Sequence, residues 1–292
     1  MRVRLATVAA CCWLLWCLAA ASQNIVGGGV YGDVKVSSGG GCSQATNFLA
    51  RTSGLSGTAT TNYTNLLCAL QTAGIGCNTS QTTNLDALYI LGAPDATTEK
   101  LNLCSSSFTL TTPSTPPTFT ANSGATFSSG IFYDTGYTPS SSAGALTQNS
   151  ASIFVYDLTN SASGSGWPIG ASTNTFSIVL GMDPLNNTYI NEATGTSTGS
   201  ANRDGGYVIV RNAASAGFIR RNESALTAIT TTSNGLPNNT IFFGCLDQGG
   251  NTACTTDTVF AEGFGPALTT TQADALMHAI NTFAKALSIN VY

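Results

Sequence analysis

The chain has 292 residues, only 8% of them charged, and its formal net charge is −4. Ordinary soluble domains contain about 25% charged residues, so hydroxyl and amide groups must supply most of the polarity of this protein. Its Lys and Arg residues form no cluster that could displace counterions from phosphates, and we expect no nucleic-acid binding. The adjacent pair Arg220-Arg221 is expected to decorate one face of a strand.

The N-terminus has the pattern of an export signal. Arg2 and Arg4 precede an apolar run over residues 5–18, and three alanines follow at 19–21. The run is shorter than the roughly 20 residues that cross a bilayer comfortably. We therefore predict a cleaved signal peptide over 1–22, a Gly/Ser-rich lead-in over 23–41 and a single β-sandwich domain over 42–292. No membrane span is expected after cleavage.

Cysteine usage also favours an oxidising compartment, so the expected location is secreted, periplasmic or cell-surface. Three of the nine cysteines fall in the predicted signal peptide. An even number remains, which suggests disulfides whose connectivity the sequence leaves open. The nearest pairs are Cys245 with Cys254 and Cys68 with Cys77, which leaves Cys42 with Cys104. With His278 as the only histidine and no Cys-x-x-Cys pair, a zinc site is not expected.

Helical patterns begin and end the predicted domain. Apolar residues recur at helical spacing over residues 60–74, where residues 60–62 are candidate caps and Gly74 is a candidate stop. A buried strand is expected over 85–91, and a short helix over 96–103 that begins at Asp95. A second long helix with one apolar stripe is expected over 269–287.

Short apolar or alternating runs, most of them bounded by turn residues, fill the region between. They predict an all-β fold, a sandwich or a barrel, whose helices cover parts of the same sandwich. The predicted strands are 118–121, 130–134, 151–158, 175–182, 188–191, 207–211, 216–221, 240–246 and 259–264.

An ordered set of short segments resembles a known family. The segments are 48–52, 63–66, 85–91, 95–98, 101–103, 133–137, 148–151, 260–264 and the helix from 268 to 287. Together they resemble the concanavalin-like (laminin-G-like) sandwich domains of phage-tail-associated and bacterial surface proteins. The resemblance implies a jelly-roll sandwich that contacts glycans or contributes to virion architecture. It implies no catalytic residues.

Catalytic patterns are scarce. A glycosidase needs two carboxyl groups about 5–10 Å apart, and no strand carries a run of alternating acids. Asp95 and Glu99 are expected to act as a helix cap and a first-turn acid. Asp257 and Glu262 are five residues apart, which strand alternation would not place on one face. We predict no catalytic residue and favour a protein that is not an enzyme, although carboxylates distant in sequence can still meet in space.

Aromatic residues in loops are the candidate ligand contacts, because a flat ring suits the apolar face of a sugar. We predict Trp167, Tyr133 and Tyr137 as ligand-binding residues; for Trp167 the competing interpretation is a plug at the end of the core. No cofactor is expected, although calcium is possible. Its weak candidate ligands are Asp247, Asn251 and Asp257, which can equally be turn residues.

Three functions follow from these observations. The leading hypothesis is a non-catalytic, exported binding or display domain that contacts carbohydrate at a cell or virion surface. The first alternative is a structural component of a phage-tail-like or surface assembly, with other surface or virion proteins as partners. The second alternative is a polysaccharide hydrolase or lyase.

Overall fold

The computed structural model describes residues 41–77, 83–113, 115–159, 166–175, 177–200, 202–250, 252–290 and 292. All of them belong to one structural unit, residues 36–292. The predicted signal peptide and nearly all of the predicted lead-in lie outside the described residues. Among the described helices, none combines the length and the apolar content that a membrane crossing requires.

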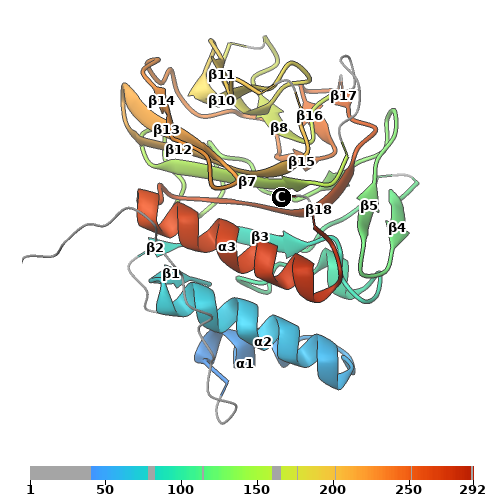
Figure 1. Ribbon diagram of the computed structural model, residues 1–292. Helices are drawn as coiled ribbons and strands as arrows, with labels where there is room; N and C mark the ends of the chain where they lie inside the picture. The colour runs from blue at the N-terminus through green and yellow to red at the C-terminus, as the bar shows by residue number, and fades with distance from the viewer. Residues whose placement is uncertain are drawn as a thin grey trace, which may run out of the picture. The chain divides into compact units, whose positions relative to one another are not determined.

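The first large sheet has antiparallel neighbours throughout (Figure 1). Its strands are β3 (Ala87–Ile90), β4 (Thr118–Thr120), β5 (Gly124–Thr126), β7 (Ala151–Asp157), β12 (Gly205–Ala213), β13 (Ala216–Arg221), β14 (Thr227–Ile229) and β18 (Thr258–Gly265). They lie in the order β14-β13-β12-β7-β18-β5-β4, and β3 also pairs with β18. The longest strands, β7, β12 and β18, are therefore neighbours in its middle.

The second large sheet lies over one face of the first. Its strands are β6 (Tyr133–Asp134), β8 (Ile169–Ser172), β9 (Val179–Met182), β10 (Asn187–Glu192), β11 (Thr196–Ser197), β15 (Phe242–Phe243), β16 (Cys245–Asp247) and β17 (Thr252–Cys254). They lie in the order β11-β10-β9-β8-β15-β6, and the β16–β17 hairpin joins β8 through one parallel pairing. The two sheets confirm the predicted all-β sandwich.

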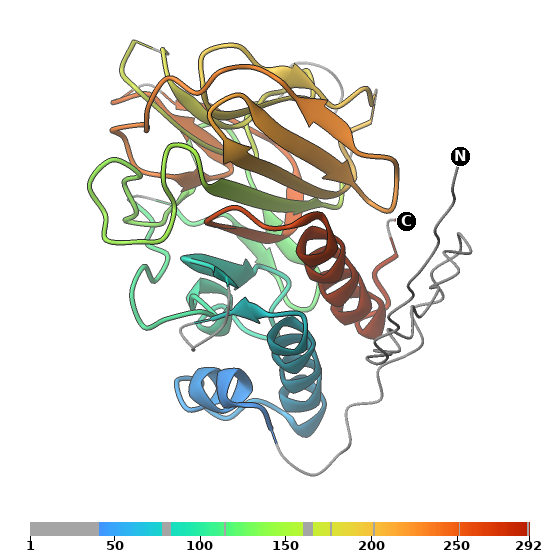
Figure 2. The ribbon, with the colours of Figure 1, turned by 90° about the vertical axis from the view of Figure 1, so that its left-hand side faces the viewer.

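Three α-helices lie on the other face of the first sheet. They are α1 (Ser43–Leu49), α2 (Gly57–Thr72) and α3 (Thr270–Ala286). Helix α3 packs against β12 and α2 packs on α3, and the turned view shows the same layering (Figure 2). A minor pair, β1 (Ile75–Gly76) and β2 (Thr83–Asn84), follows α2.

The predicted C-terminal helix is confirmed, and its Thr269 forms a capping box with Gln272. Helix α2 begins earlier than predicted, because the Ser56 side chain accepts from the Ala59 amide and caps it there. Residues 60–62 thus lie inside the helix. The predicted helix over 96–103 is wrong in extent: only η1, the 3₁₀ turn Thr98–Lys100, forms. Asp95 does accept from the Thr97 and Thr98 amides, as a cap should.

Some strands also differ from the sequence prediction. Helix α1 and several strands were not predicted: β1, β2, β5, β8, β11, β14 and β17. The predicted strand over 240–246 divides into β15 and β16 at Gly244, whose φ is +81°. A Cβ there would come within 2.1 Å of the Phe127 ring, so both the backbone conformation and the space require glycine.

Two apolar cores follow from strand alternation. On β7, Ile153 and Val155 face the second sheet, whereas Phe154 and Tyr156 face the helices. We call these regions the inter-sheet core and the helix-side core. The sequence of β7 is almost continuously apolar, as expected for a strand that is buried on both faces.

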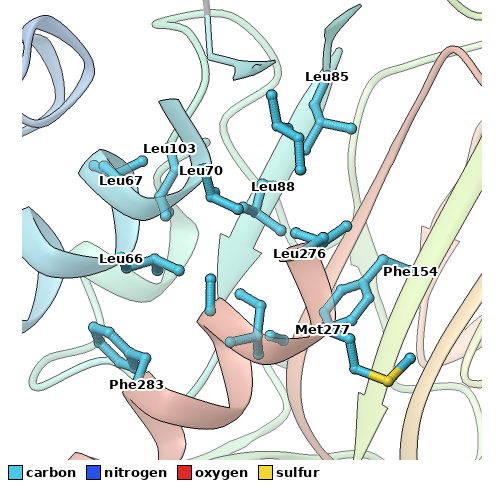
Figure 3. Close-up of a cluster of buried hydrophobic side chains, with 14 of the residues drawn as sticks. Leu66, Leu67, Leu70, Leu85, Leu88, Leu103, Phe154, Leu276, Met277 and Phe283 are labelled. Carbon is cyan, nitrogen blue, oxygen red and sulfur yellow. The ribbon is translucent and has the colours of Figure 1, made fainter. Parts of the chain in front are cut away.

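Side chains from α2, α3 and the first sheet meet in the helix-side core (Figure 3). Leu66 and Leu70 on α2 lie near Leu88 on β3 and Leu276 on α3, all of them nearly or fully buried. The aromatic ring of Tyr63 lies 5.0 Å from that of Phe283, which ties the two helices together.

The six cysteines predicted to form disulfides all do so. Cys245 pairs with Cys254 across the β16–β17 hairpin, as predicted. The other two predicted pairings are wrong: Cys42 pairs with Cys68 and Cys77 with Cys104. The reason is the unpredicted helix α1, which packs on α2 and brings its preceding residue Cys42 to Cys68.

Leu276→Ala should destabilise the protein by about 2–5 kcal/mol, because it removes a buried side chain from the helix-side core. Urea unfolding followed by circular dichroism measures the change. Thr282→Ala, on the exposed face of the same helix, should change stability by about 0.5 kcal/mol or less. Equal losses in the two variants would contradict this account of the core.

Candidate functional site

The three aromatic residues predicted to bind ligand are buried. Tyr133 and Tyr137 are 0% exposed and Trp167 is 5% exposed. The Tyr133 hydroxyl donates to Glu99 over 2.7 Å, and the Tyr137 hydroxyl donates to Asp86 over 3.1 Å. Ligand contact by these residues stays a prediction, and for Trp167 the burial favours the competing interpretation of a core plug.

Trp167 belongs to a small apolar cluster on the outer face of the second sheet. With it lie Val179 and Leu246, and the half-buried Tyr189 packs on the cluster with its ring 5.3 Å from the Trp167 ring. Alternation places the cluster on the face opposite the inter-sheet core, because the next residues, Leu180 and Ile190, belong to that core. The ring of Trp167 therefore packs against the ring of Tyr189 on this outer face.

Beside this cluster the β9–β10 turn presents apolar and polar groups to solvent. Leu185 is 68% exposed, the largest exposure among the large hydrophobic residues of the described chain. The Asp183 carboxylate accepts from the amides of Leu185 and Asn187, both over 2.8 Å, and from the Tyr189 hydroxyl over 3.3 Å. We call Asp183, Leu185, Asn187 and Tyr189 the β9–β10 surface.

The β9–β10 surface combines the groups that sugar recognition uses. Tyr189 and Asn187 are half-buried and supply an aromatic ring and an amide, and Leu185 supplies an exposed apolar side chain. Burial and the nearby Asp183 carboxylate raise the pKa of Tyr189 to about 12, so its hydroxyl stays protonated at neutral pH. The hydrogen bonds of Asp183 fix the turn and hold these groups in place.

This surface was not predicted from the sequence. Two sequence features point weakly to this surface. One is the turn sequence 183–186, which contains an Asp, a Pro and an Asn, and the other is the aromatic residue Tyr189, which precedes the buried Ile190 on the following strand. Neither signal reveals which face of the strand is exposed.

A buried ionic cluster centred on Arg203 lies next to Trp167. The guanidinium of Arg203 forms ion pairs with Asp257 and, over 3.6 Å, with Asp157. It also donates to the Gly166 carbonyl over 2.9 Å and to the Thr255 hydroxyl over 2.5 Å. The cluster thereby joins the end of β7 and the start of β18 to the segment that holds Trp167.

Asp157 and Asp257 are far apart in sequence and meet at one guanidinium. Both are 0% exposed and Arg203 is 2% exposed. Burial raises the pKa of Asp157 to about 7, and the charge of Arg203 opposes that rise. A glycosidase pair must reach its substrate, whereas these two carboxylates face Arg203 inside the protein. The arrangement therefore suits a structural ion pair better than catalysis.

The remaining predicted site residues have partners that hold the fold together. The Asp247 carboxylate accepts from the amides of Gly249 and Thr240, and Asp257 is paired with Arg203. Asn251 lies outside the described residues. The weak hypothesis that these residues bind calcium stays untested.

Two more sequence expectations concern charged and titratable residues. Arg220 and Arg221 lie on β13, where they pair with Asp274 over 2.8 Å and with Asp204 over 3.5 Å, respectively. His278 is on an exposed part of α3. Glu99 lies in the first turn of η1, as the sequence suggested, and there it is buried and accepts from Tyr133.

Comparisons with known proteins give no family. No protein-family model matches the chain, and no curated protein matches it. Among solved structures, a Trypanosoma rangeli sialidase in complex with 2,3-difluorosialic acid is similar over 77% of this chain and 39% of its own, with a TM-score of 0.47 and 10% identity. Domain 4 of AbnA, a GH43 extracellular arabinanase from Geobacillus stearothermophilus in complex with arabinotriose, is similar over 67% of this chain and 98% of its own, with a TM-score of 0.36 and 12% identity.

These similarities are too distant to carry an argument about function. The chain spans about two fifths of the length of the sialidase that it matches. The resemblance to phage-tail-associated and concanavalin-like proteins is not confirmed by these comparisons. The function must therefore be argued from the geometry of the described residues.

Arg203→Leu should destabilise the protein by about 3–5 kcal/mol at neutral pH, because it leaves Asp157 and Asp257 buried without a cation. Denaturant unfolding measures the loss. Arg221→Ala, which breaks a partly exposed ion pair, is the matched control and should cost about 1 kcal/mol or less. A loss no larger for Arg203→Leu than for the control would show that the cluster does not stabilise the fold.

Proposed function

We propose that this protein is a non-catalytic domain that acts outside the cytoplasm and binds carbohydrate through the β9–β10 surface. The observation that carries the proposal is the exposed Leu185 in the β9–β10 turn, close in sequence to the half-buried Asn187 and Tyr189 of β10. An exposed apolar group and an aromatic ring match the apolar face of a sugar, and the oxygen atoms of the Asn187 amide and the Tyr189 hydroxyl, which both donate to Asp183, can accept from its hydroxyl groups.

The low charge of the protein supports the same conclusion. Only 8% of the residues are charged, and several of the carboxylates are buried or cap turns. A ligand without charge, recognised by hydroxyl and amide groups, fits such a surface better than a nucleic acid or a highly charged polymer.

An extracytoplasmic location is supported by the three disulfides, because such bonds persist mainly in oxidising compartments. The apolar N-terminal sequence adds to this support. Secretion itself is part of the proposal.

Leu185→Ala should weaken binding to a neutral polysaccharide by roughly tenfold, because the variant loses a side chain that the ligand would bury. Isothermal titration calorimetry against a panel of polysaccharides and oligosaccharides measures the affinity. The matched control is Leu226→Ala, which changes the other exposed leucine of the described chain, 44% exposed and on a different loop, and it should bind as the wild type does.

Tyr189 provides a second test of the same surface. Tyr189→Ala should weaken binding more than Tyr189→Phe, because the phenylalanine keeps the ring that packs on Trp167 and forms part of the surface. Equal affinity in the wild type and the Leu185 and Tyr189 variants, each shown to be folded by circular dichroism, would overturn the assignment of the surface.

The two alternative functions predict other results, which copurification and product analysis measure. A structural module of a surface or virion assembly would bind no glycan and would copurify with a larger particle. A hydrolase or lyase would release reducing ends or unsaturated products from the panel.

A further inference from the structure

The interior of the described protein contains more acids than bases. Two guanidinium groups, Arg203 and Arg211, are buried. Seven carboxyl groups are buried as well: Glu99, Asp157, Asp183, Glu192, Asp247, Asp257 and Glu262. A buried carboxylate is costly unless a cation or hydrogen-bond donors compensate it.

Most of these carboxyl groups have such compensation. Arg211 donates to Glu192 over 2.6 Å, and Arg203 forms ion pairs with Asp157 and Asp257. Asp183 and Asp247 accept from backbone amides. Glu99 accepts one hydrogen bond, from Tyr133, and its second oxygen has no partner.

Glu262 differs from all of them. It lies in the middle of β18, 0% exposed, and neither of its carboxyl oxygens has a hydrogen-bond partner among the described residues. It pairs in register with Val155 on β7 and Tyr89 on β3. Both of these residues belong to the inter-sheet core, so Glu262 points into that core as well.

The groups around Glu262 do not supply a cation. Asp157, at the end of β7, is the charged residue that acts on it and is itself an acid. The hydroxyl of Tyr89 donates instead to the Phe108 carbonyl. The other tyrosines of the inter-sheet core direct their hydroxyl groups elsewhere: Tyr133 to Glu99, Tyr137 to Asp86 and Tyr207 to the Asn202 carbonyl.

We propose that the missing partner of Glu262 is a proton, so that the folded protein holds this residue as a neutral carboxylic acid and is more stable in mildly acidic than in alkaline solution. Burial raises the pKa of Glu262 well above its ordinary value, and the charge of Asp157 raises it further. Burial also raises the pKa values of Glu99 and Asp157 to about 7, which acts in the same direction.

The sign of the pH dependence follows from linkage. An unfolded Glu releases its proton near pH 4.3, whereas the folded protein keeps it to a higher pH. Below about pH 4 both states hold the proton and Glu262 contributes no pH dependence. Above about pH 4 the unfolded protein has released the proton of Glu262, whereas the folded protein still holds it. Each buried carboxyl group of this kind therefore lowers the folding equilibrium constant by up to about tenfold per pH unit, until the pH reaches the pKa of that group in the folded protein.

This inference is independent of carbohydrate binding and concerns the conditions under which the domain is most stable. Because Glu262 is a neutral acid in the inter-sheet core, the stability of the folded sandwich depends on the pH of the solution. A protein of this design has its greatest stability on the acidic side of neutrality.

The test is urea unfolding at a series of pH values from 4 to 8 on the wild type, Glu262→Gln and Glu262→Met. The wild type should lose stability as the pH rises, with an equilibrium constant that falls by at least tenfold between pH 5 and pH 8. Both variants should show a smaller fall, because neither side chain can ionise. The matched control is Glu223→Gln at an exposed position, which should keep the wild-type slope.

Slopes are compared because either substitution can change the packing by an amount that does not depend on pH. A wild-type stability that is constant or rises from pH 5 to pH 8 would overturn the proposal, and so would variants that keep the full wild-type slope. If both variants fail to fold, infrared spectroscopy of the wild type decides. The carbonyl absorption of a protonated carboxylic acid should be present in the folded protein at pH 8, where Glu99 and Asp157 are mostly ionised, and absent after unfolding at the same pH; its absence from the folded protein would refute the proposal.

Discussion

The fold depends on covering both faces of the first sheet. Strands β7, β12 and β18 lie in its middle, and their side chains alternate between the helix-side core and the inter-sheet core. Each face needs its own cover, because an open apolar sheet face would be exposed to water. Helix α3 covers one face and the second sheet the other (Figure 1). The position of every candidate functional residue follows from this layering.

The same constraint explains where polar chemistry can occur. Acids on the central strands face a core, so Asp157 needs Arg203 and Glu262 is left without a cation. Tyr189 lies instead on the outer face of the second sheet, which none of the described helices covers. There the buried ring of Trp167 supports Tyr189, and Asp183 holds the adjoining turn. The distribution separates buried ionic groups, which face a core, from the partly exposed polar and aromatic groups of the β9–β10 surface.

Local patterns predicted much of this structure. The apolar stripe of α3 and the continuous run of β7 depend on neighbours in sequence, and both were correct. Partners distant in sequence could not be predicted. The pairing of Cys42 with Cys68 needed helix α1, and the meeting of Arg203 with Asp257 needed the sheet order. On β18 a register shift between Val259 and Ala261 changes the alternation, so simple counting could not assign the face of Glu262. The β9–β10 surface had only weak turn signals.

The described chain begins and ends in the helical layer. Cys42 immediately precedes α1, and Tyr292 lies beside Tyr156 on the helix side of the first sheet, with ring centroids 6.0 Å apart. The outer face of the second sheet is on the opposite side of the sandwich from both of these positions. An affinity handle or a fusion partner attached near either position would therefore leave the outer face of the second sheet unobstructed. Immobilisation through such a handle would turn that face of the described domain away from the support.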